Sequence, residues 1–288
     1  MKRFISILMV AIMVIACASA VSAEEYHHDF EDESAGMFSM NGSQFPSIKE
    51  ENGNHFINFG ATIEECEANG VVYDTDEDGN KVYVSGGVDG MLNYTSPLVS
   101  TYGNEFILEC QMRFHKFDNY VYEEGNKLFQ IQPKAILDDG TQAWAGNVRP
   151  AMVIVNKDGV PALTGQGADH AYACKWDTWY DVALAFDFTE HVVTGYINGN
   201  KAYTANIMTD DKVVVDYAYC YWGVPDKVPF PFDVDMDDLY IFSGTKPKKD
   251  PTGDLDPEVD VPTGDVTAIV ALVAVLACGT GIVASKKH

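Results

Sequence analysis

The chain has 288 residues, of which 43 are acidic and 19 are basic, giving a formal net charge of −24. Phosphate backbones and anionic lipid headgroups would repel such a surface, so the composition excludes nucleic acid and anionic membrane surfaces as partners. At this length, a single domain between the two chain ends can bury a substantial core.

The chain begins with the layout of a secretory signal peptide. Lys2 and Arg3 precede an apolar stretch at residues 4–16, and small residues follow at 21–23. This pattern predicts residues 1–23 as the signal, with cleavage after Ala23. The alternative is lipid attachment at Cys17, because residues 14–17 resemble a lipobox. Either route leads to export of the chain.

Residues 24–243 alternate between apolar and polar side chains, as antiparallel strands do when one face lies in a core. In residues 106–114 the even positions are all apolar and most odd positions are polar. Residues 180–186 repeat this pattern, and residues 239–242 read as a final strand. The pattern predicts one all-β domain built as a sandwich or barrel. Turn signals stand at 78–80, 139–140, 158–159 and 198–199.

Four segments of this region resemble bacterial concanavalin A-like, laminin-G-like modules. They are the opening residues 29–32, the stretch 52–59, the pair 179–184 and 195–199, and the closing residues 237–241. The resemblance implies two curved antiparallel sheets in a jelly roll, often with a sugar-binding concave face or edge loops. It does not by itself determine the function.

The resemblance also implies a structural calcium ion between the opening and closing strands. Carboxylate oxygens are hard ligands that suit this ion. The alternative is that these acidic side chains are simply solvated at strand ends, as expected in so acidic a chain. The expected ligands are Asp29, Glu31, Asp237 and Asp238.

A second acidic stretch, residues 74–79, matches the first half of an EF-hand calcium loop. The twelfth position of that loop is Ser85, where a bidentate Glu is required. Because strand-like residues flank the stretch on both sides, it predicts a plain β-hairpin turn.

Sugar binding needs a flat aromatic face against pyranose C–H groups, with amides and carboxylates for the hydroxyls. Trp144 is the best candidate for such a face, Trp222 is the second and Trp176 is weaker. Trp179 stands at the start of a predicted strand and is expected in the core. Any of these aromatic side chains could instead be packed inside the domain. The predicted sugar-binding set is Trp144, Trp222, Tyr221, Gln142 and Asn147.

Catalytic signatures are weak. The sequence lacks the Glu-x-Asp-x-x-Glu and Glu-x-Asp-x-Glu spacings of jelly-roll glucanases, and it lacks Gly-x-Ser-x-Gly and His-Glu-x-x-His. We therefore expect a non-catalytic carbohydrate-binding or adhesion module with a polysaccharide or glycan as partner. The alternatives are a polysaccharide lyase or glycoside hydrolase on the same fold, and a structural surface protein that binds other proteins.

Four cysteines lie in the predicted domain, and the exported location permits disulfides. They allow three pairings that the sequence does not rank, and buried free thiols are an equal alternative. These cysteines are Cys66, Cys110, Cys174 and Cys220.

The C-terminal end resembles a cell-wall sorting signal of Gram-positive bacteria. A Pro-rich acidic linker at residues 244–265 ends in Pro-Thr-Gly-Asp, and residues 266–288 form an uncharged apolar run with a basic tail. The resemblance implies that a sortase cleaves between Thr263 and Gly264 and joins the chain to the wall, although the proline stands one position later than in the family pattern. The alternative is a plain membrane anchor. Both place the domain outside the cell.

Overall fold

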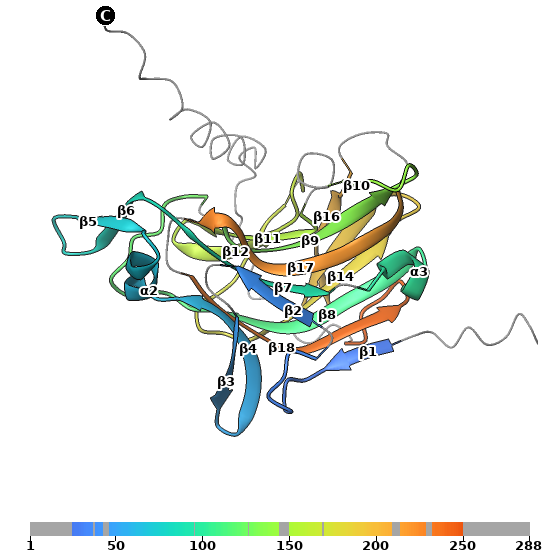
Figure 1. Cartoon of the computed structure of the whole chain (residues 1–288), viewed down its shortest axis with the longest axis horizontal. Helices are drawn as coiled ribbons and strands as arrows, with labels where there is room; N and C mark the ends of the chain where they lie inside the picture. The colour runs from blue at the N-terminus through green and yellow to red at the C-terminus, as the bar shows by residue number, and fades with distance from the viewer. Residues whose placement is uncertain are drawn as a thin grey trace, which may run out of the picture.

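A computed structural model describes residues 25–36, 38–42, 46–94, 96–125, 127–143, 150–168, 170–208, 214–228 and 232–249 (Figure 1). The predicted signal, the predicted apolar span and the sorting motif lie outside these residues. Within the described part of the chain, the helices are too short or too polar to cross a bilayer.

Eight antiparallel strands form one sheet, here called sheet A. The order across it is β16-β15-β14-β8-β18-β4-β3, and β1 pairs with the end of β18 that β4 leaves free. The strands are β1 (Glu25–His28), β3 (Ser47–Glu51), β4 (Asn54–Ala61), β8 (Glu105–Phe114), β14 (Tyr180–Asp187), β15 (Val192–Ile197), β16 (Asn200–Asn206) and β18 (Phe232–Ser243).

Eight further antiparallel strands form sheet B. The order is β13-β12-β11-β9-β17-β7-β2, and the short β10 pairs with β9. The strands are β2 (Phe38–Gly42), β7 (Val88–Tyr94), β9 (Lys127–Leu137), β10 (Gln142–Ala143), β11 (Met152–Lys157), β12 (Val160–Thr164), β13 (Tyr172–Ala173) and β17 (Val214–Val228).

The two sheets stack as layers with the core between them (Figure 1). Phe59 of β4 meets Phe129 of β9 edge to face, with ring centroids 5.2 Å apart, which joins the inner faces of the sheets. All even positions of β8 from 106 to 114 are buried in this core, as the alternation predicts. The predicted all-β sandwich of two antiparallel sheets is therefore confirmed, and its strand order is consistent with the predicted jelly roll.

The acidic stretch at residues 74–79 comprises the end of β5 (Val72–Thr75) and most of the hairpin turn that leads to β6 (Lys81–Ser85), as predicted. Asp76 Oδ1 accepts the backbone N–H groups of Asp78 (3.0 Å) and Asn80 (2.8 Å). The turn thus uses this carboxylate to satisfy its own backbone, which is the ordinary role of Asp in a turn.

Two short helices were not apparent from the hydrophobic pattern. The helix α2 (Ile63–Ala68) begins with a capping box between Thr62 and Glu65, a local signal that the sequence does contain. The helix α3 (Leu98–Tyr102) is capped from outside, because the Asp216 carboxylate of β17 accepts the N–H groups of its first turn. Only the tertiary structure supplies that cap.

The four cysteines of the domain carry unpaired, buried thiols. Burial raises the pKa of Cys66 to about 11 and that of Cys174 to about 12, and it also raises the pKa values of Cys110 and Cys220. These thiols stay protonated at neutral pH and behave as small apolar side chains. The sequence left disulfides and free thiols as alternatives, and the structure contains free thiols.

Candidate functional site

The site lies where β18 changes neighbours on the outer face of sheet A. β18 pairs with β4 as far as Met236 and with β1 from Leu239 onward, so Asp237 and Asp238 fall between the two. The register against β8 also shifts between Asp237 and Tyr240, and Asp238 has a φ of 48°. This bulge opens a gap in the sheet exterior.

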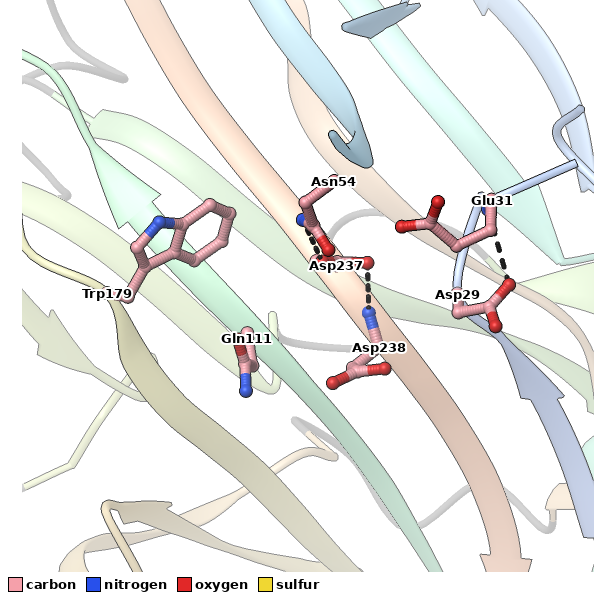
Figure 2. A pocket seen from close by; sticks show the side chains of 7 residues that line it. All are labelled: Asp29, Glu31, Asn54, Gln111, Trp179, Asp237 and Asp238. Atoms are coloured by element: carbon pink, nitrogen blue, oxygen red, sulfur yellow. Dashed lines mark hydrogen bonds between the residues drawn. The ribbon is translucent and has the colours of Figure 1, made fainter. Parts of the chain in front are cut away.

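The gap forms an open pocket of about 410 Å³ (Figure 2). Its walls come from several segments: the residues after β1, the start of β4, the middle of β8, the bulge of β18 and the residue before β14. All four side chains of the predicted calcium set are among them. The lining residues are Asp29, Glu31, Asn54, Gln111, Trp179, Asp237 and Asp238.

Asp237 lies at the floor of the pocket with only 6% of its surface exposed. Its Oδ2 accepts a hydrogen bond from Asn54 Nδ2 (2.9 Å), and its Oδ1 accepts one from the Asp238 N–H (2.7 Å). Burial raises the pKa of Asp237, an effect that the Asn54 hydrogen bond opposes and the charges of Asp238 and Glu31 reinforce. A cation in the pocket would offset this crowding of negative charge.

Histidines stand at the rim of the pocket. The His55 backbone N–H donates to Glu31 Oε1 (3.0 Å), and His55 Nδ1 lies 3.2 Å from Glu31 Oε2. These contacts lower the pKa of Glu31, and the side-chain hydrogen bond raises the pKa of His55. His27 Nε2 lies 3.6 Å from Asp238 Oδ1. The two histidines therefore contact two of the four acidic side chains of the pocket.

The side chains of the pocket offer a metal ion carboxylate and amide oxygens as ligands, a set that suits calcium, whereas the indole of Trp179 is not a metal ligand. In the described part of the chain, one group of three His, Cys, Asp or Glu side chains has its ligand atoms all within 4.8 Å of one another. This group is His115, Asp233 and Asp235, so the carboxylates of the pocket lie farther apart than that. A calcium ion in the pocket would therefore need backbone carbonyls or water to complete its ligands.

The cluster around Asp235 is an ion-pair network. His115 Nε2 lies 2.7 Å from Asp235 Oδ2, and the same oxygen accepts Arg113 Nε (2.8 Å) and Nη2 (2.7 Å). The other ring nitrogen, Nδ1, lies 2.6 Å from Asp177 Oδ1. The hydrogen bond to Asp235 raises the pKa of His115 to about 9, so at neutral pH both ring nitrogens carry protons. A metal ion would have to displace one of these protons, which lowers the affinity of the imidazole for the ion at neutral pH.

Trp179 links this network to the pocket. The Arg113 guanidinium lies 4.7 Å from the Trp179 ring centroid and 5.5 Å from that of Phe56, and the two rings meet edge to face at 5.8 Å. The indole is partly exposed and forms one wall of the pocket (Figure 2). The expectation that Trp179 belongs to the core is therefore wrong.

Trp222 lies in the core with 0% of its surface exposed, and its ring meets Phe38 edge to face at 5.5 Å. The proposed sugar contact of Trp222 is therefore wrong, because a buried ring has no face to offer a ligand. Trp176 is partly buried, stacked on Tyr122 at 5.6 Å, and its Nε1 donates to the Gly159 carbonyl (2.9 Å).

The rest of the predicted sugar set belongs to sheet B. Tyr221 of β17 pairs with Gln132 of β9, and Gln142 of β10 pairs with Ile136 of the same strand. The backbones of the two residues therefore flank β9. Trp144 and Asn147 lie outside the described residues. This part of the prediction stays open.

Besides Trp179, which was expected in the core, two pocket residues were not predicted as site residues: Asn54 and Gln111. Gln111 is a polar odd position in the strand at 106–114, so the alternation places it on the outer face of the sheet. Asn54 belongs to the family-like stretch 52–59. Neither pattern says that β18 would bring them together.

No family model and no curated protein matches this chain. Among solved structures, the chain is similar to a carbohydrate esterase of the Shiga toxin-encoding bacteriophage phi24B, with a TM-score of 0.50 and 10% identity over 77% of this chain and 100% of that one. It is also similar to an endo-β-1,4-glucuronan lyase of the fungus Trichoderma reesei, with a TM-score of 0.47 and 10% identity over 78% and 98% of the two chains. It is similar as well to a peanut lectin, with a TM-score of 0.44 and 11% identity over 76% of this chain and 98% of that one. At such identities the likeness concerns the fold alone, a sandwich of two antiparallel sheets.

Proposed function

We propose that this domain binds carbohydrate in the pocket around Asp237 without catalysing a reaction. The observation that carries the proposal is the lining of the pocket, where one partly exposed indole, Trp179, stands beside carboxylates and amides. The indole suits the C–H face of a pyranose ring, and the polar groups suit its hydroxyls. An open, shallow pocket of about 410 Å³ fits one or two sugar rings.

The imidazole of His115, whose pKa is raised to about 9, is not part of this lining. His115 and Arg113 both bind the carboxylate of Asp235 at 2.7–2.8 Å and lie beside the pocket. A general base must reach the proton that it abstracts, and His115 is held between Asp235 and Asp177 instead. The engagement of His115 favours binding over a reaction that uses this imidazole as the base.

We further propose that the pocket holds a calcium ion close to the sugar site. Asp237 with Asp29, Glu31 or Asp238 would supply its carboxylate ligands, and backbone carbonyls or water would complete the shell. The support for this proposal is the oxygen donor set and the raised pKa of Asp237, which a nearby cation would lower. Because the ligands come from the two ends of the domain, the ion would stabilise the junction between β1 and β18.

Export and anchoring are proposed from the sequence pattern of the two chain ends. Residues 1–23 would direct secretion, and residues 266–288 would stop in the membrane, with Thr263 and Gly264 as the sorting cleavage site. Mass spectrometry of the mature protein tests this: an N-terminus at Glu24 and a C-terminal Thr263 joined to cell-wall peptide are expected. A lipid on Cys17, or an intact residue 288, would contradict the respective cleavage.

A glycan array probed with the purified chain, with calcium and then with chelator, tests the binding proposal. Trp179→Ala should weaken binding to any glycan that the wild type retains by roughly tenfold, the loss of an aromatic contact of about 1.5 kcal/mol. Trp176→Ala is the matched control, because this tryptophan is also partly exposed but stacks on Tyr122. Absence of binding by the folded protein would refute the proposal, and cleavage of the glycan would indicate an enzyme.

A further inference from the structure

The chain turns back over sheet A after its last strand. β18 ends at Ser243, and Gly244 has a φ of 148°, a backbone conformation that favours glycine. The Gly244 N–H donates to the Glu105 carbonyl (3.0 Å), which holds the start of the turn. We call residues 244–249 the strap.

Lys248 attaches the strap to three strands. Its backbone N–H donates to Glu109 Oε2 of β8 (3.1 Å), and its ammonium group pairs with the Glu25 carboxylate of β1. The same ammonium group lies 4.3 Å from the ring centroid of Tyr240 and 4.8 Å from that of Phe242, both in β18. Lys248 therefore spans the exterior of β1, β18 and β8.

Lys249 adds a contact to a fourth strand, because its ammonium group pairs with the Asp181 carboxylate of β14. Each of these exposed contacts is weak, with ion pairs contributing about 0–1 kcal/mol and cation–π contacts about 0.5–1 kcal/mol. Several weak contacts together hold a segment in place while leaving its release reversible.

The strap covers a part of the sheet exterior that would otherwise meet water. Glu109 is only 6% exposed although its side chain points away from the core between the sheets. Next to it, Ile107, Ala183 and Phe242 form a small buried cluster on this outer face, with Tyr240 and Tyr196 packed against it. If the strap left this face, Glu109 would offer a carboxylate to a polar ligand, and Tyr240 and Tyr196 would offer aromatic rings.

This covered surface continues the pocket. Glu109 and the pocket residue Gln111 are two positions apart on β8, so their side chains share one face about 7 Å apart. In register, Asp181 stands opposite Gln111 on β14, and Tyr240 stands opposite Glu109 on β18. The anchors of the strap are thus the next row of side chains beside the pocket.

We propose that the strap is a lid over the continuation of this pocket along β8, held by Lys248 and Lys249. With the strap in place, the ligand is confined to the pocket around Asp237 and Trp179. With the strap released, Glu109, Asp181 and Tyr240 join the pocket as a longer groove. The inference concerns access to the groove and does not depend on which ligand the pocket takes.

Zero-length cross-linking of the full-length protein with a water-soluble carbodiimide, followed by peptide mass spectrometry, tests the position of the strap. Amide bonds are expected between Lys248 and Glu25 and between Lys249 and Asp181. Lys246 is the internal control: it is exposed, and it takes no part in the ion pairs found among the described residues. Absence of both cross-links in the folded protein would overturn the proposal.

Carboxyl labelling, with carbodiimide and an added amine, tests the lid. The double substitution K248A/K249A should raise the labelling rate of Glu109 several-fold, whereas Lys246→Ala should leave it at the wild-type rate. Thermal unfolding of each variant establishes that the domain remains folded. Equal labelling of Glu109 in the wild type and the double variant would overturn the lid, whatever the protein binds.

Discussion

Replacing His115 by Gln should remove a contribution to stability that is present at neutral pH and absent in alkali. In the folded protein the imidazole sits between Asp235 (2.7 Å) and Asp177 (2.6 Å), and its pKa rises from 6.5 to about 9. At 1.4 kcal/mol per pH unit, this rise corresponds to about 3 kcal/mol. The ring is 24% exposed, so solvent screening reduces the expected value to about 2 kcal/mol.

The direction of the pH dependence follows from the raised pKa. Below pH 6.5 the imidazole is protonated in both the folded and the unfolded chain, so the full contribution is present. Between pH 6.5 and about 9 only the folded chain keeps the proton, and the contribution declines. Above pH 9 it is lost. The wild type should therefore exceed His115→Gln in stability by about 2 kcal/mol at pH 6 and match it near pH 10.

Urea denaturation of both proteins at pH 6, 7.5 and 10 measures this difference, and other titrating groups cancel between them. Asp177→Asn is the control: this carboxylate is 64% exposed, so its loss should cost well under 1 kcal/mol at every pH. A stability difference between wild type and His115→Gln that is constant with pH, or that grows toward alkali, would refute the assignment of a protonated His115.

Three further outcomes are expected. Calcium at 100 times its dissociation constant should raise the Tm of the wild type by roughly 5–10 °C and that of Asp237→Asn much less; equal shifts would exclude Asp237 as a ligand. A thiol reductant should leave the Tm unchanged, because the four buried cysteines are unpaired; a clear drop would reveal a disulfide. Provided that the domain binds sugar as proposed, the double variant K248A/K249A should bind long oligosaccharides more tightly than the wild type and single sugars equally. Lys246→Ala is the control. For a protein that binds single sugars, equal affinity of wild type and double variant for long chains would contradict the lid.

The predictions for Trp179 and Trp222 were both wrong, and they show what the local sequence pattern can and cannot predict. Tyr180, Val182 and Leu184 are buried in the core, so the alternation of the strand itself places the preceding Trp179 outside. That signal was present in the sequence. For Trp222 the inward direction depends on its partners in register, Leu92 of β7 and Ile131 of β9, both fully buried. Only the assembled sheet reveals them.

The outer face of sheet A shows a second limit. Ile107 and Phe242 are apolar positions on a face that the alternation treats as solvated, and both are buried. The segment that covers Phe242, the strap, belongs by composition to a Pro-rich linker. Composition describes what a segment can do in isolation, whereas its docking depends on the surface that it meets.

The sequence by itself located several strands, and for those at 106–114 and 180–186 it determined which side faces the core, because side-chain direction alternates with period two along any strand. It also determined the acidic surface and, through the resemblance, the pairing of Asp29 and Glu31 with Asp237 and Asp238 as a candidate site. Only the tertiary structure decided that Asn54, Gln111 and Trp179 complete the pocket. Asn54 and Asp237 hydrogen-bond across 183 positions of sequence, and such contacts follow from the register of whole sheets packed on one core.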